Sequence, residues 1–75
     1  MNNKKRKAIA KTSELIAVAV EQLNDILEEE QEDFENMPEG LQSSERGIMS
    51  EEAQECLESA ICSLEDAIEV LKEID

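Results

Sequence analysis

The side chains of this chain that could do chemistry are carboxylates and two thiols. Among its 75 residues are 20 Asp and Glu, two Cys and no His. Without His the chain lacks the commonest general base and many metal ligands. Two carboxylate pairs one helical turn apart, Glu51 with Glu55 and Glu65 with Glu69, offer oxygen ligands for Ca²⁺ or Mg²⁺. No looped set of oxygens accompanies them, so we interpret both pairs as a solvated helix face.

No pattern of an enzyme or of a cofactor site accompanies these carboxylates. Di-metal carboxylate bundles need a Glu-x-x-His pair, which a chain without His lacks. Two Cys without His make a poor structural zinc site, and two glycines do not build a phosphate-binding loop. The sequence therefore predicts a protein that is not an enzyme and that uses no cofactor or metal.

The two cysteines, Cys56 and Cys62, lie on one predicted helix. They are six positions apart, which places them about 240° apart around the helix axis, so they cannot pair with each other there. Free thiols are typical of a reducing setting, and we predict a cytoplasmic protein. Cys56 falls on the apolar side, where we expect it to pack, and Cys62 falls toward the acidic side.

Charge is divided unevenly along the chain. Five of the seven basic residues lie within residues 4–11, and all 20 acidic residues follow from Glu14 onward. Residues 1–11 carry a formal charge of +5 and residues 12–75 carry −18, which gives −13 in total. Such an acidic body repels nucleic acid and anionic lipid, and it suits a basic protein surface. We therefore expect no direct nucleic-acid partner, and no membrane partner because no long apolar run occurs.

Apolar residues recur at helical spacing through two long segments. We predict a helix at about 5–35, a turn at 36–43 and a helix at about 44–74. A connection this short makes the two helices antiparallel neighbours. The predicted fold is therefore all-α, a single antiparallel two-helix hairpin.

The predicted turn rests on Pro38, which disfavours helix in the residue before it. Pro38 followed by Gly40 fits a type I turn. Ser44 is our preferred cap for the second helix, and Ser50 is the alternative, because Gly47 weakens an earlier start.

The second helix carries leucines every seven residues, with Ala60 and Ala67 at the next heptad position, where a neighbouring helix can approach closely. A hairpin buries only one stripe of each helix, and so short a chain seldom suffices alone. We predict a homodimer that forms an antiparallel four-helix bundle; the alternative is a monomer whose open face binds another protein. The predicted self-association residues are Val20, Leu27, Leu57, Ile61, Leu64, Ile68 and Leu71.

The antiparallel hairpin places the basic segment, residues 4–11, beside the acidic residues of segment 65–75. We interpret the basic segment as a charge match within the hairpin. The alternative is a nucleic-acid-binding arm, although neither aromatic residues nor glycines interleave its lysines.

An acidic stretch, residues 28–33, interrupts the apolar stripe of the first helix, and Glu30 falls in register with Ile16 and Leu23. Either the helix pair opens there into a polar pocket or binding surface, or the stripe continues through Leu27 and Phe34 while Glu30 stays at the rim.

The segment from Glu35 to Arg46 reads Glu-Asn-Met-Pro-Glu-Gly-Leu-Gln-Ser-Ser-Glu-Arg. With the Glu- and Leu-rich helix after it, this turn resembles short acidic hairpin proteins of Gram-positive bacteria, their phages and their prophages. The resemblance covers about half of the chain, from Asp33 onward, and Gly47 stands where it leads us to expect an aromatic residue. It implies a helical hairpin from a mobile element and implies no activity.

These patterns favour a small adaptor or inhibitor that binds a basic host protein, with each carboxylate meeting Lys or Arg and with Met37 and Leu41 making apolar contacts. The alternatives are a purely architectural turn, a self-assembling structural bundle, and an oligomer that sequesters a small ligand. The predicted partner-binding residues are Glu28, Glu29, Glu32, Asp33, Asn36, Met37, Glu39, Gln42, Glu45 and Arg46.

Overall fold

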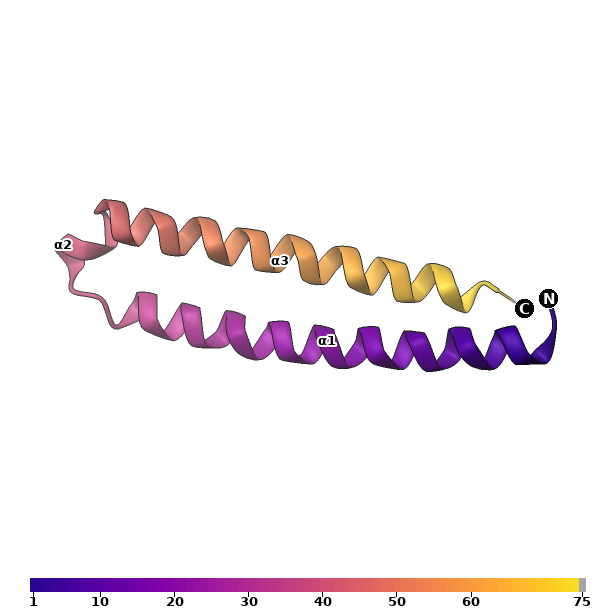
Figure 1. The fold of residues 1–75 in the computed structure, drawn as a ribbon. Coiled ribbons are helices and arrows are strands. Elements are labelled where there is room, and N and C mark those ends of the chain that lie inside the picture. The colour runs from indigo at the N-terminus through magenta and orange to yellow at the C-terminus, as the bar shows by residue number, and fades with distance from the viewer. Residues whose placement is uncertain (75) are drawn as a thin grey trace.

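The computed structural model describes residues 1–74 (Figure 1). Two long helices, α1 (Asn3–Glu35) and α3 (Glu45–Lys72), run side by side in opposite directions. A one-turn helix, α2 (Glu39–Gln42), lies in the connection between them. This part of the chain contains no strand, so the predicted all-α fold is confirmed, whereas α2 is an element that the sequence pattern does not predict.

One row of residues on each long helix forms the seam between α1 and α3. Its positions alternate steps of four and three residues, the spacing that keeps a row facing a neighbouring helix. Every seam residue is buried or half-buried, and the centre of the core is formed by Val20, Leu27 and Ile61. The seam comprises Ile9, Ser13, Ile16, Val20, Leu23, Leu27, Glu30 and Phe34 on α1 and Gly47, Ser50, Gln54, Leu57, Ile61, Leu64, Ile68 and Leu71 on α3.

The residues that we predict for self-association all lie in this seam. Val20, Leu27 and Ile61 are only 8%, 9% and 7% exposed, so a single hairpin already buries them. The remaining four are half-buried, namely Leu57, Leu64, Ile68 and Leu71. Because these side chains already pack within one copy, a self-association surface needs other residues.

The alanine row of α3 lies outside the seam. Ala60 is exposed and Ala67 half-buried, whereas Ile61 and Ile68, one residue further along, belong to the seam. Cys56 is also exposed, so our expectation that it packs is wrong for the hairpin. One residue turns the helix by about 100°, which is enough to move a side chain from the seam to the side of the hairpin.

The two chain ends meet at the end of the hairpin opposite α2 (Figure 1). The basic residues 4–11 therefore lie at the same end as the last turns of α3, as the hairpin geometry predicts; Asp75 lies outside the described residues. Within residues 1–74 the only ion pair closer than 4.0 Å joins Lys72 to Glu69, at 3.3 Å on the surface. The charge match is thus one of general proximity rather than of direct ion pairs.

Candidate functional site

The turn is built around the backbone of Pro38. Its φ and ψ are −57° and 146°, and its carbonyl accepts hydrogen bonds from the amides of Leu41 and Gln42, at 2.8 and 3.2 Å. These bonds begin α2. A type I turn with Pro38 as its second residue needs ψ near −30°, so the turn type that we predict is wrong. The chain instead makes one helical turn before α3.

The side chain of Gln42 ties α2 to the end of α1. Its Nε2 donates hydrogen bonds to the carbonyl oxygens of Phe34 and Met37, at 3.1 and 3.2 Å. These carbonyls lie where the α1 helix runs out of its own donors. Gln42 is half-buried and occupied inside the molecule, so its role in the structure is architectural.

Gly47 allows α2 to lie directly against α3. A Cβ atom at position 47 would lie 2.0 Å from the carbonyl oxygen of Gln42, and Gly47 is buried. No larger residue fits this approach unless the backbone moves. The aromatic residue that the resemblance leads us to expect at position 47 therefore has no room here.

Ser44 occupies the N-cap position of α3, and Ser50 lies inside the helix. The hydroxyl of Ser44 donates to the carbonyl of Leu41 instead of accepting a bond from the first turn of α3. Ser44 thus connects α2 to α3, while Ser50 is free to face α1.

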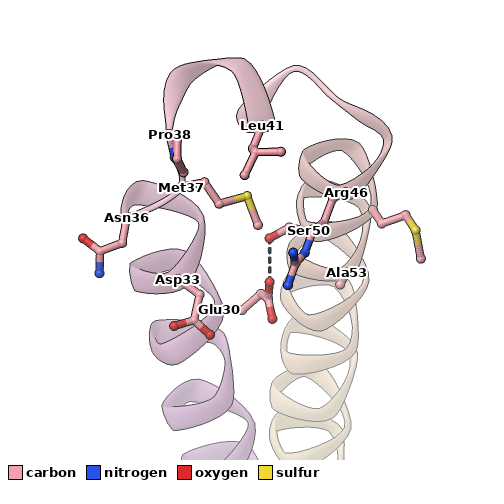
Figure 2. A pocket seen from close by; sticks show the side chains of 10 residues that line it. Glu30, Asp33, Asn36, Met37, Pro38, Leu41, Arg46, Ser50 and Ala53 are labelled. Atoms are coloured by element: carbon pink, nitrogen blue, oxygen red, sulfur yellow. Dashed lines mark hydrogen bonds between the residues drawn. The ribbon is translucent and has the colours of Figure 1, made fainter.

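A cleft of about 620 Å³ opens below this turn, between the end of α1 and the start of α3 (Figure 2). It combines two carboxylates and one guanidinium with apolar side chains, the mixture that suits a long cationic side chain. Its lining comprises Glu30, Asp33, Asn36, Met37, Pro38, Leu41, Arg46, Met49, Ser50 and Ala53.

A chain of hydrogen bonds crosses the seam at the inner wall of the cleft. The Ser50 hydroxyl donates to Oε2 of Glu30 at 2.6 Å, as Figure 2 shows, and Gln54 donates to Ser50 at 3.3 Å. Ser50 is 6% exposed and Glu30 is half-buried. The structure combines parts of the two alternatives for Glu30, because Glu30 lines a polar cleft while the apolar seam continues from Leu27 to Phe34.

Arg46 extends along the cleft beside Ser50 and Glu30 (Figure 2). Within residues 1–74, neither Glu30 nor Asp33 has a cation closer than 4.0 Å. A cationic side chain of another molecule would thus meet two carboxylates that no ion pair engages.

The predicted partner-binding residues fall into three groups. Four line the cleft, namely Asp33, Asn36, Met37 and Arg46. Gln42 is half-buried. Five are exposed outside the cleft, namely Glu28, Glu29, Glu32, Glu39 and Glu45.

The prediction missed Met49, Ser50 and Ala53 among the lining residues. The available signal was the helical register of α3, since Ser50 falls seven residues before the first seam leucine, Leu57. Met49 and Ala53 each immediately precede a seam residue in sequence, so the same register places them next to the seam.

A second feature of the surface is an acidic face along one side of the hairpin. It consists of the residue that follows each seam residue in sequence. One step along a helix rotates the side-chain direction by about 100°, and because the two helices are antiparallel, this rotation brings both sets of side chains to the same side of the hairpin. It carries four carboxylates on α1 and five on α3, against one Lys. This acidic face comprises Ala10, Glu14, Ala17, Glu21, Asn24, Glu28, Gln31 and Glu35, and Ile48, Glu51, Glu55, Glu58, Cys62, Glu65, Glu69 and Lys72.

The opposite side is a low-charge face, formed by the residue that precedes each seam position. It carries two carboxylates and one basic residue, Arg46, and its larger apolar side chains are exposed. The cleft marks the turn end of this face, since Asp33, Met49 and Ala53 all line it. The low-charge face comprises Ala8, Thr12, Leu15, Ala19, Gln22, Ile26, Glu29 and Asp33, and Arg46, Met49, Ala53, Cys56, Ala60, Ser63, Ala67 and Val70.

No group of three or more Cys, Asp and Glu side chains within residues 1–74 is arranged to hold a metal ion. None of the three helices is both long and apolar enough to cross a bilayer. The chain matches no protein-family model, no curated protein and no solved structure.

Proposed function

We propose that this protein is a small non-enzymatic adaptor or inhibitor that binds a basic protein. The observation that carries the proposal is the acidic face, where nine carboxylates stand against Lys72 alone, and Lys72 already pairs with Glu69. A surface of one sign attracts an oppositely charged partner and raises its rate of association.

The cleft at the turn end adds a specific contact to this general attraction. A Lys or Arg of the partner enters between Glu30 and Asp33, and its aliphatic stem packs on Met37 and Leu41. The two carboxylates then form charge-assisted hydrogen bonds, which are stronger than neutral ones. The exposed residues Glu39 and Glu45 are sequence neighbours of Pro38 and Arg46, which line the cleft.

The setting that we propose is the cytoplasm of a bacterial host, with the chain carried by a phage or another mobile element. The cytoplasm follows from two exposed, unpaired cysteines. The mobile element follows from the resemblance of the turn sequence.

The test is the salt and charge dependence of binding to the partner that crosslinking captures from the host. Replacing Glu51, Glu55 and Glu58 by Gln removes three charges from the acidic face and should raise the Kd at least about tenfold. Raising the ionic strength should weaken wild-type binding as well.

A matched control removes the same three charges from the outer edges of the hairpin by Asp25→Asn, Glu52→Gln and Asp66→Asn. These residues are exposed and lie on neither the acidic face nor the cleft. Its Kd should change by less than about threefold. Equal effects of the two triple variants, or binding that salt leaves untouched, contradict the proposal.

A second proposed function is self-assembly into a homodimeric four-helix bundle. It is favoured by the low-charge face, on which Leu15 and Met49 are 64% and 63% exposed. Light scattering at micromolar concentration tests it, because a particle of 8.4 kDa is a monomer and one of twice that mass is the dimer.

A further inference from the structure

We infer that the low-charge face is covered by a second copy of this chain that runs in the opposite direction, so that the two turn ends lie far apart. This inference rests on the proposed self-association and specifies its surface and its orientation. The residues that form the contact are those of the low-charge face rather than those of the seam.

The amount of exposed surface indicates that a partner is missing. The chain exposes 5872 Å², whereas a compact monomer of its mass exposes about 4,600 Å². The excess, about 1,200 Å², is larger than the roughly 800 Å² that each partner buries in a standard interface. The shape agrees, since the hairpin extends 58 × 15 × 12 Å.

The low-charge face is the side on which this excess is apolar. Leu15, Ile26 and Val70 on this face are 64%, 49% and 60% exposed. The acidic face carries nine carboxylates, and two such faces would repel each other. Of the two sides, only the low-charge face can therefore meet a copy of itself.

The contact rows are symmetric in spacing. On α1 the alternation of three- and four-residue steps is the same in both directions about the midpoint between Ala19 and Gln22, and over residues 53–70 of α3 it is the same about the midpoint between Ala60 and Ser63. The two midpoints lie at nearly the same level, because Val20 and Ile61, beside them, pack in one core cluster. A single two-fold axis across the hairpin can thus relate both rows to a second copy.

This axis pairs α1 with α1 and α3 with α3. Leu15 of one copy then meets Ile26 of the second copy, and Ala60 meets Ser63 of the second copy. The short side chains of the α3 row let these two helices approach toward the lower end of the usual 8–10 Å separation. Every helix in the resulting bundle is antiparallel to its neighbours.

The charges of α1 decide between this arrangement and one with the turn ends together. Residues 4–11 carry five basic side chains and residues 28–35 carry six acidic ones. The antiparallel pairing brings Lys7 to the level of Asp33 of the second copy and Lys11 to the level of Glu29 of the second copy. The parallel arrangement instead places residues 28–35, with six acidic side chains, beside the acidic start of α3, residues 45–55, which is repulsive. The antiparallel pairing also brings two acidic segments of α3 together, residues 45–55 and 65–74, but each of these carries a net charge of only −3.

The first test of the inference compares two exposed positions of α3. Ala60→Glu introduces a charge beside the proposed axis, and Ile48→Glu introduces one on the acidic face. Light scattering should give a dimer for the wild type and for Ile48→Glu. Ala60→Glu should weaken dimerisation at least about a hundredfold, because the carboxylate is buried without a partner. Helicity by circular dichroism reports whether each variant folds.

The second test measures orientation and does not depend on the folding of Ala60→Glu. A spin label at Gly40→Cys, with Cys56→Ser and Cys62→Ser, marks the turn at a position where an added Cβ atom meets nothing within 4 Å. Pulsed electron resonance should give a label separation close to the 58 Å length of the hairpin.

The outcomes separate the inference from the proposal on which it rests. A wild-type monomer at all accessible concentrations contradicts both. A folded Ala60→Glu variant that dimerises as the wild type does contradicts only the assigned face. A label separation well under half of the hairpin length contradicts only the antiparallel orientation.

Discussion

At the scale of single residues, the turn end is held by specific contacts of three residues, Gly47, Gln42 and Ser50. Gly47 is fixed by the backbone of Gln42, Gln42 by the last carbonyls of α1, and Ser50 by the carboxylate of Glu30. Glu30 and Ser50 replace apolar packing in the seam and hold the wall of the cleft. Because these contacts hold the groups around it in place, the cleft is a fixed part of the fold.

The close approach at Gly47 gives the first prediction. Gly47→Ala should lower the free energy of unfolding by about 1–3 kcal/mol, because the new Cβ overlaps the backbone of Gln42, even though Ala is the better helix former. Gly40→Ala is the matched control. Its Cβ meets nothing within 4 Å and its φ is not positive, so it should stabilise by a few tenths of a kcal/mol. Thermal unfolding followed by circular dichroism that ranks Gly47→Ala above Gly40→Ala would contradict this account.

The hydrogen bond between Ser50 and Glu30 gives the second prediction. Ser50→Ala leaves the half-buried Glu30 carboxylate without its donor and should cost about 1–2 kcal/mol of stability. Combining it with Glu30→Leu replaces both partners by apolar groups and should recover most of the loss. The measurement is urea unfolding of the two single variants and the double variant. Purely additive effects would show that the two side chains do not interact.

At the scale of elements, each long helix separates three kinds of row: a seam, an acidic face and a low-charge face. Both long helices and the turn position follow from apolar periodicity and from Pro38, so this part of the fold is predictable from the sequence. The seam of α3 is not, because Ala60 and Ile61 are both apolar and the stripe spans two rows. Only packing against α1 selects Ile61, the larger side chain, for the space between the helices.

The cleft was only partly predictable for a related reason. The register of Glu30 signals a polar interruption of the stripe, but its hydrogen bond depends on which residue of α3 lies opposite. That pairing is set by α2, whose length and direction depend on Gln42 and Gly47 through contacts between residues distant in sequence.

The assignment of the seam gives the third prediction. Ile61→Ala removes a side chain that is 7% exposed at the centre of the core and should cost about 2–4 kcal/mol. Ile48→Ala on the same helix, where Ile48 is 51% exposed, should change stability by less than about 0.5 kcal/mol. If urea unfolding gave similar losses of stability at both positions, the row of residues assigned to the seam of α3 would be wrong.

At the scale of the whole molecule, the hairpin has two sides of different chemistry, for which we propose different partners. The acidic face carries charge that a copy of the chain repels and that a basic protein attracts. The low-charge face, whose turn end is the cleft, is the one that we propose a second copy covers, so the cleft is open to a basic partner only in the monomer. The net charge of −13 keeps such an assembly from associating further through its outer surface.

The two native cysteines report on these sides directly, because Cys56 lies on the low-charge face and Cys62 on the acidic face, and both are exposed in the hairpin. The decisive measurement is the alkylation rate of each thiol by a neutral reagent, read by mass spectrometry over a range of protein concentrations. We expect Cys62 to react at one rate throughout. At concentrations where the protein is a dimer, Cys56 should react at least about tenfold more slowly than in dilute solution. A Cys56 rate that does not change with concentration, or protection of Cys62 instead, would contradict the division of the molecule into a covered and an open side.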